Sequence, residues 1–172
     1  VVRNLFNFAS MAFGFYTVYA VQTFGMNEAT AGVMTSVLAG IQIIANPILG
    51  WLGDHTGHRL ILAAGALSAI LSAGLAVFAP SVGWFYLIFL CAGLTSVAYW
   101  TIGMSMTLEF GSEQDRPAYI GLANTLTAPT SILAPLFGGW LADQVGYTMT
   151  FSVAVLSALL TLSVLIFILR DP

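Results

Sequence analysis

The 172-residue chain is too apolar for a water-soluble domain, because hydrophobic residues make up 59% of it and charged residues only 6%. Soluble domains carry about 25% charged residues. Four arginines against seven acids give a net charge of −3, so no basic patch is present that could bind nucleic acid. The single cysteine, Cys91, leaves no disulfide within the chain. This composition predicts an integral membrane protein.

The charged residues are confined to a few positions, and the stretches between them are long enough to cross a bilayer. A helix needs about 20 apolar residues to span about 30 Å of hydrocarbon. The stretch from Arg59 to Glu109 holds two spans, joined by a Pro/Gly turn at 79–83. Continuous apolar runs favour helices over barrel strands, whose residues alternate. We therefore predict six transmembrane helices, at residues 4–25, 28–53, 59–79, 83–109, 117–142 and 148–169.

Local signals refine these helices. Asn27 is suited to cap the second one. The three prolines inside spans each remove a backbone hydrogen bond, so we expect kinks there. Small residues repeat at four-residue spacing on the third helix, which predicts close packing of that face on a neighbour. The prolines are Pro47, Pro129 and Pro135, and the small residues are Gly65, Ala69 and Ala73.

Six spans place both termini on one side of the membrane. All four arginines and both histidines also fall on that side, and the positive-inside rule assigns it to the cytoplasm. We therefore expect cytoplasmic termini and a plasma (inner) membrane location. The residues concerned are Arg3, Arg59, Arg116, Arg170, His55 and His58.

An internal repeat relates the two halves of the chain. The segment Gly50–His58 recurs as Gly139–Tyr147, with five of nine positions identical. The first copy ends the second predicted helix and the second copy ends the fifth. Three spans separate them, so the copies are expected on opposite faces of the membrane. This pattern predicts a 3+3 inverted repeat within one domain, 1–172, with repeats at about 1–80 and 83–172.

The first copy carries a family resemblance. The run Gly50-x-x-x-Asp54-His55-x-Gly57-His58-Arg59 resembles the cytoplasmic loop signature of the major facilitator superfamily, Gly-x-x-x-Asp-Arg/Lys-x-Gly-Arg/Lys-Arg/Lys. The two histidines depart from its usual basic residues. Glu109 with Arg116 resembles the acid-to-arginine pairing after the fourth helix in that family. The resemblance covers the whole chain as one six-helix half of a transporter.

The resemblance implies half of a secondary-active, alternating-access carrier for a small-molecule solute, with no cofactor. A second six-helix half would come from the same polypeptide or from a dimer partner. The start at Val1, the softened signature and the ending Arg170-Asp171-Pro172 favour the C-terminal half of a longer chain.

The resemblance also implies a cytoplasmic latch, whose ion pairs form in one conformation and break in the other. Gly50 would allow close helix approach and Gly57 a tight turn. The alternative is that these charges only set topology and cap helices. The two histidines fall short of the three or four ligands that a metal needs, so no metal is expected. The latch residues are Gly50, Asp54, Gly57, Arg59, Glu109 and Arg116.

Polar groups at bilayer depth tend to face the interior of a helix bundle, and the resemblance places helices one, two, four and five around the cavity. The alternative for each is helix–helix hydrogen bonding or, for an aromatic, packing. No acid or base lies mid-span to carry a proton. The cavity candidates are Tyr16, Tyr19, Gln42, Asn46, Tyr99, Trp100, Asn124 and Thr127.

Two other functions compete with transport. A structural or assembly subunit would need neither the repeat nor the loop signature. An intramembrane protease could use Ser105 as its nucleophile, but both histidines lie in a loop and cannot act as its base. We therefore predict that the protein is not an enzyme.

Overall fold

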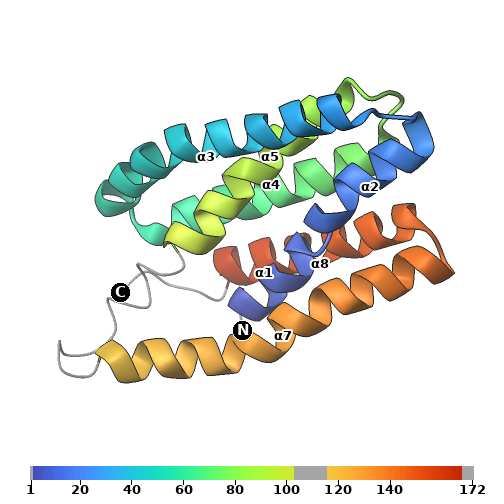
Figure 1. The fold of residues 1–172 in the computed structure, drawn as a ribbon. Helices are drawn as coiled ribbons and strands as arrows, with labels where there is room; N and C mark the ends of the chain where they lie inside the picture. The colour runs from blue at the N-terminus through green and yellow to red at the C-terminus, as the bar shows by residue number, and fades with distance from the viewer. Residues whose placement is uncertain (1, 103–115, 168–172) are drawn as a thin grey trace.

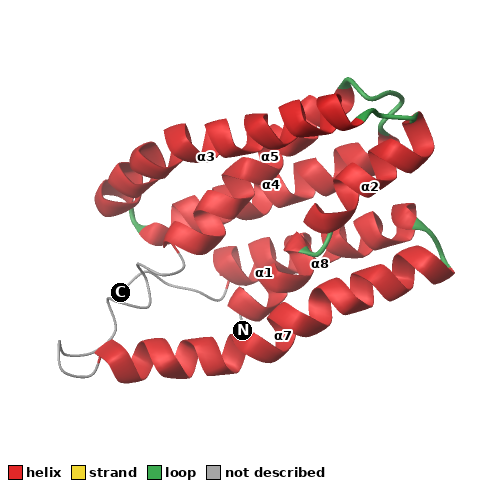
Figure 2. Cartoon of the chain, in the orientation of Figure 1, coloured by secondary structure: helices red, strands yellow, loops and turns green. Residues whose placement is uncertain are grey.

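A computed structural model describes the backbone of residues 2–102 and 116–167, and the side chains of residues 2–100 and 117–167. Every regular element in these ranges is helical, as predicted (Figures 1 and 2). In chain order they are α1 (Val2–Ser10), α2 (Phe13–Phe24), α3 (Glu28–Thr56), α4 (His58–Phe78), α5 (Trp84–Val97), the π-helical segment η1 (Ala98–Ile102), α7 (Arg116–Gln144) and α8 (Tyr147–Phe167).

Four of the described helices, α3, α4, α7 and α8, are long and apolar enough to cross a membrane. The run Trp84–Trp100 forms a shorter apolar helix. The predicted cap is confirmed, because Asn27 Oδ1 accepts a hydrogen bond from the Thr30 N–H at 2.7 Å. The long helices α3 and α7 continue through their internal prolines.

The first predicted helix, 4–25, is divided in two, so the prediction of one continuous helix was wrong here. α1 ends at Ser10 and α2 begins at Phe13. The Ser10 hydroxyl donates to the Asn7 carbonyl at 3.1 Å, and the Met11 N–H bonds only the Phe8 carbonyl, three residues back, at 3.4 Å. The same serine bond occurs at Ser72 and Ser131 inside unbroken helices, so the Ser10 hydroxyl alone does not explain the break.

The helices lie along one axis and alternate in direction (Figure 1). α4 packs against α8 and α5, α3 packs against α5, and α1 packs against α7 and α8. The small-residue face of α4 is buried, as predicted, and a Cβ added at Gly65 would overlap the Ala98 side chain. Close approach of this face brings α4 and η1 together.

The two copies of the repeat end α3 and α7 at opposite ends of the bundle (Figure 1). Each copy ends its helix with a glycine of positive φ, Gly57 at 90° and Gly146 at 104°. Positive φ is costly for residues with a Cβ. The tight turn predicted at Gly57 is therefore present, and its counterpart Gly146 shares the positive φ.

The helices differ in how much of their surface the bundle buries. In the most apolar 18-residue stretch of each helix, only 11% of the residues of α3 and 6% of those of α7 are buried, against 44% for α4 and 33% for α8. Large apolar side chains on α3 and α7 therefore face outward. They include Ile43, Ile44, Ile48, Leu126, Leu133 and Leu136.

Candidate functional site

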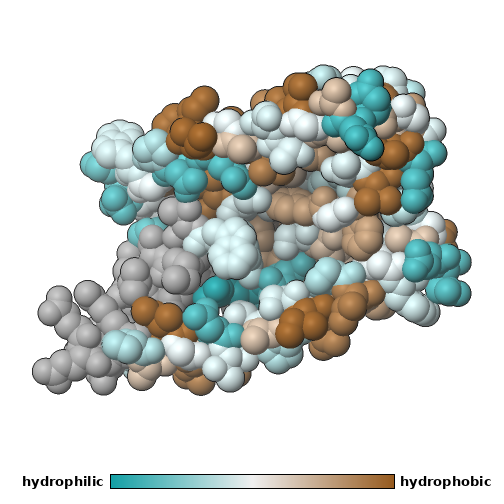
Figure 3. Space-filling view, in the orientation of Figure 1, coloured by the Kyte–Doolittle hydropathy of each residue, from teal (hydrophilic) through white to brown (hydrophobic). Residues whose placement is uncertain are grey.

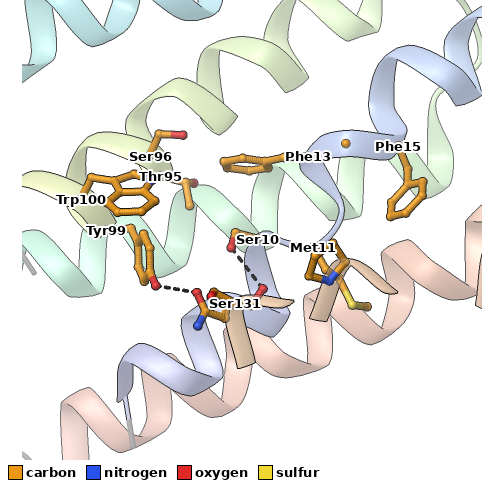
Figure 4. Close-up of a pocket in the computed structure, with 12 residues that line it drawn as sticks. Ser10, Met11, Phe13, Phe15, Thr95, Ser96, Tyr99, Trp100 and Ser131 are labelled. Atoms are coloured by element: carbon orange, nitrogen blue, oxygen red, sulfur yellow. Dashed lines mark hydrogen bonds between the residues drawn. The ribbon is translucent and has the colours of Figure 1, made fainter. Parts of the chain in front are cut away.

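A pocket of about 300 Å³ lies where α1, α2, α5, η1 and α7 meet (Figure 4). In the space-filling view this face of the molecule is hollowed between α5 and α7 (Figure 3). The wall combines aromatic rings with small polar groups. The polar lining is Asn7, Ser10, Thr95, Ser96 and Ser131, and the aromatic lining is Phe13, Phe15, Tyr99 and Trp100.

Two irregularities of the backbone border this pocket. The first is the break between α1 and α2, after Ser10. The second is the π-helical turn η1, which carries Tyr99 and Trp100. π-helical turns are frequent at functional sites, and interrupted helices are typical of transporter binding sites near the bilayer midplane. Both irregularities direct side chains into the same space.

A chain of hydrogen bonds closes one end of the pocket. The Tyr99 hydroxyl donates to Asn7 Oδ1 at 2.5 Å, and Asn7 Nδ2 donates to Thr130 Oγ1 at 2.8 Å. The Thr130 hydroxyl lies 2.9 Å from Asn4 Oδ1. Figure 4 shows the Tyr99 hydroxyl turned toward this network. A single carboxamide on α1 thereby connects η1 with α7.

Arg3 adds a positive charge next to this network. It lies four residues before Asn7, on the same face of α1, and its guanidinium lies against the Tyr99 hydroxyl. Two of its nitrogens, Nε and Nη1, are buried without a hydrogen-bond partner among the described residues. An unsatisfied buried donor costs about 1–3 kcal/mol, and more when it is charged. Arg3 is not itself a lining residue of the pocket, so this unused donor capacity lies beside the pocket, next to the Tyr99 hydroxyl.

Trp100 provides an apolar plane on the pocket wall. Its indole is 64% exposed, and it meets the Tyr99 ring edge-to-face, with centroids 5.3 Å apart and an interplanar angle of 81°. Tyr99 itself is 8% exposed. The tyrosine is thus held in place by packing, while the tryptophan presents its ring to the open side.

The predicted cavity residues fall into two groups. Tyr99 and Trp100 line the pocket. Thr127 lies beside it, where its carbonyl accepts a hydrogen bond from Asn7 Nδ2 at 3.4 Å. Asn124 is exposed on α7, almost one turn before Thr127.

The other four candidates lie away from this pocket. The Tyr16 side chain is buried in the core, where its hydroxyl donates to Ser72 Oγ at 3.1 Å. The Tyr19 ring packs against aromatic rings of α2, α5 and α8. On α3, Asn46 Nδ2 donates to the Gln42 carbonyl at 2.8 Å, and this helix provides no lining residue of the pocket.

Sequence reasoning overlooked the centre of the network and the charge beside it. Asn7 was not proposed as a cavity residue, and Arg3 was used only to assign topology. A signal was available, because Asn4 and Asn7 are three residues apart in a predicted span and so share a helix face. Their alignment with Thr130 on α7 depends on packing that no local pattern encodes.

The proposed latch residues are only partly described. Asp54 is exposed, and a Cβ at Gly50 would meet nothing within 4 Å. Arg59 Nε donates to the Leu165 carbonyl and Nη2 to the Ile166 carbonyl, both at 2.6 Å. Glu109 and the side chain of Arg116 lie outside the described residues. Within the part of the chain that is described, no group of three or more metal-ligating side chains occurs.

The family model of the Major Facilitator Superfamily matches residues 4–172. Relatives include the probable vesicular acetylcholine transporter-B of Danio rerio, with 32% identity over 71% of this chain and 25% of the relative. Tetracycline resistance protein, class H, of Pasteurella multocida has 31% identity over 79% of this chain and 34% of the relative. Dipeptide and tripeptide permease A of Chromobacterium violaceum has 29% identity over 88% of this chain and 32% of the relative.

The chain therefore belongs to the major facilitator superfamily. Its relatives are membrane transporters rather than enzymes, and the apolar helices agree with an integral membrane protein. Ser105, considered as a nucleophile, lies outside the described residues. The matched region spans about a quarter to a third of the length of these relatives.

Proposed function

We propose that this chain forms one six-span half of an alternating-access transporter and that the pocket between α1, α5 and α7 binds its solute. The pocket is the observation that carries this proposal. It gathers five small polar side chains and four aromatic rings in a chain of which 59% of the residues are hydrophobic. Polar groups at bilayer depth are expensive and mark solute pathways. The names of the relatives suggest a small organic solute.

A 3+3 inverted repeat is supported by the pattern of helix contacts. α1 packs on α7 as α5 packs on α3, and α1 packs on α8 as α5 packs on α4. α3 contacts α4 as α7 contacts α8. The first three spans are α1 with α2, then α3, then α4, and the last three are α5 with η1, then α7, then α8. Replacing each span of one set by the matching span of the other set turns each contact above into its counterpart. We propose that the repeats divide the chain at about 80–83.

A second six-helix half would cover α3 and α7. These two helices expose the most apolar surface relative to their length, and contiguous apolar surface marks an interface with protein or lipid. We propose that the partner half belongs to the same polypeptide or to a second subunit. The halves would rock against each other around the pocket.

The first test concerns sidedness. We propose that the end with Thr56 faces the cytoplasm of a plasma (inner) membrane, as do both termini. In a Cys91→Ala background, Thr56→Cys should react with a membrane-impermeant maleimide only from inside, and Val145→Cys only from outside. Labelling of both cysteines from the same side would contradict the inverted repeat.

The second test concerns access to the pocket. Ser131 lines the pocket and is exposed, whereas Ser72 is buried in the core. Ser131→Cys should therefore be labelled from either side of the membrane, in proportion to the time the cavity opens to that side. Ser72→Cys is the matched control and should stay unlabelled. Labelling of Ser131→Cys from one side only, in all conditions tested, would rule out alternating access.

The third test concerns the latch. Asp54→Asn should leave membrane insertion intact and move labelling of Ser131→Cys toward the cytoplasmic reagent. We expect a change of up to about fivefold, since an exposed ion pair is worth about 0.2–1 kcal/mol. Glu28→Gln, which removes the carboxylate at the other end of α3, is the control. An unchanged ratio in Asp54→Asn would leave these charges with a topological role alone.

A further inference from the structure

We propose that the pocket selects planar aromatic solutes that carry a carboxylate or a similar anionic group. Arg3, with Tyr99 and Asn7, would take the anion, and Trp100 would stack on the ring. The inference rests on the proposed transport function and deepens it by naming a substrate class. It starts from two Arg3 nitrogens without a partner among the described residues, next to the Tyr99 hydroxyl at one end of the pocket, and from the open indole face on the pocket wall.

Among the described residues, no lining side chain balances the charge of Arg3. The lining residues in this part of the chain include no aspartate or glutamate. Within the described residues, Arg3 Nε and Nη1 both lack an acceptor, and their N–H groups point to different sides of the guanidinium. A hydrogen bond from a guanidinium to a carboxylate is charge-assisted and about twice as strong as a neutral one. An anionic group would therefore accept a charge-assisted hydrogen bond from one of these nitrogens.

Tyr99 would connect the anion subsite with the backbone of the π-helical turn η1. Its hydroxyl lies against the Arg3 guanidinium and also donates to Asn7. Because both arginine nitrogens are buried in this conformation, an anion reaches them when the tyrosine turns away from Asn7. Tyr99 belongs to the π-helical turn η1, so occupation of the subsite would act on that turn directly.

The size and wall of the pocket favour a ring. A cavity of about 150 Å³ holds one benzene molecule, and this pocket has about 300 Å³. The space suits one or two fused rings with a polar substituent. Trp100 is held edge-to-face by Tyr99, which leaves its exposed face available for offset stacking on a planar ligand.

The test uses three small probes that separate charge from aromaticity: benzoate, benzamide and cyclohexanecarboxylate. Their dissociation constants would be measured by titration calorimetry on the intact protein in detergent. We expect benzoate to bind at least about tenfold more tightly than benzamide, which corresponds to about 1.4 kcal/mol. Benzoate should also bind more tightly than cyclohexanecarboxylate, because only benzoate stacks on the indole.

Variants assign these differences to residues. Arg3→Gln should bring the dissociation constants of benzoate and benzamide close to each other. Arg3→Lys keeps the positive charge and should restore part of the preference for benzoate, which would also show that a substitution at this position leaves the site folded. Trp100→Leu should remove the preference for benzoate over cyclohexanecarboxylate and leave the charge preference in place. Equal affinity for benzoate and benzamide in the unmodified protein, no binding of benzoate, or a preference for benzoate unaffected by Arg3→Gln would each overturn the proposal.

The outcome can be separated from that of the transport proposal. Labelling of Ser131→Cys from both sides reports alternating access without any ligand. If that labelling occurs and benzoate shows no advantage, the anion subsite fails and the transporter stands. If labelling comes from one side only, the transport proposal fails irrespective of the affinities.

Discussion

Replacement of Arg59 by glutamine should loosen the end of α8. The arginine donates two hydrogen bonds of 2.6 Å to the carbonyls of Leu165 and Ile166, in the last turn of that helix. Hydrogen bonds to charged groups contribute about 1.5–3 kcal/mol each, and a cation at a helix C-terminus adds about 0.3–1 kcal/mol. Arg59 is half-buried, so we take the lower values. A glutamine keeps one neutral bond, and the expected loss is about 2–3 kcal/mol.

Hydrogen–deuterium exchange of the intact protein in lipid nanodiscs measures this loss locally. Amides in the last turns of α8 should exchange about 30-fold to 150-fold faster in Arg59→Gln, because a factor of ten corresponds to about 1.4 kcal/mol. Arg59→Lys keeps the charge but not the fork, and should give an intermediate rate. His55→Gln, on the exposed end of α3, is the control.

The reasoning would be refuted by unchanged exchange at the end of α8 in Arg59→Gln. It would equally be refuted if Arg59→Lys behaved as the unmodified protein, since the charge alone would then explain the effect. A uniform increase along all of α8 would indicate that the whole helix had separated from α4, which the burial of Leu165 against α4 argues against.

Two further predictions concern packing and are measured by thermal unfolding in detergent. Gly93→Ala should destabilise the protein by about 1–3 kcal/mol, because the added Cβ would overlap Ile41 Cγ2 on α3. Gly74→Ala is the control and should be neutral or stabilising, since a Cβ there meets nothing within 4 Å. Equal effects of the two changes would contradict the close α3–α5 contact. Tyr16→Phe removes the hydroxyl that donates to Ser72 in the core and should cost about 0.5–1.5 kcal/mol, whereas a loss below the error of the measurement would mean that this bond is not formed.

The helices could be predicted from the sequence because the thickness of a bilayer fixes how many consecutive residues must be apolar. Charges cannot be left in hydrocarbon, so the gaps between charges give the helices almost directly. Asn27 and Gly57 could be assigned because capping and positive φ are decided by neighbouring residues. These features follow from the local chain and need no knowledge of tertiary packing.

The candidate site was only partly predictable, because partners distant in sequence decide it. The break after Ser10 and the π-helical turn at Tyr99 shift the side chains from the faces that a regular helix would give them. Tyr16 was assigned to the cavity from such a regular pattern, yet it pairs with Ser72 in the core. Asn7 was missed because its partners, Tyr99 and Thr130, are 92 and 123 residues away.

The hydrogen bonds around Asn7 have a single direction. Tyr99 is the donor in the first bond and Asn7 in the second, and the Thr130 hydroxyl has two acceptors within reach, Asn4 Oδ1 and the Thr127 carbonyl, each at 2.9 Å. Bonds aligned head to tail polarise one another, so each is stronger for the presence of the others. The carboxamide cannot flip without presenting its NH₂ group to the Tyr99 hydroxyl and its oxygen to Thr130, which would require both hydroxyls to reorient with it. A flip would also turn the Asn7 oxygen toward the Thr127 carbonyl, which can only accept, so the carboxamide has one favoured orientation between the three helices.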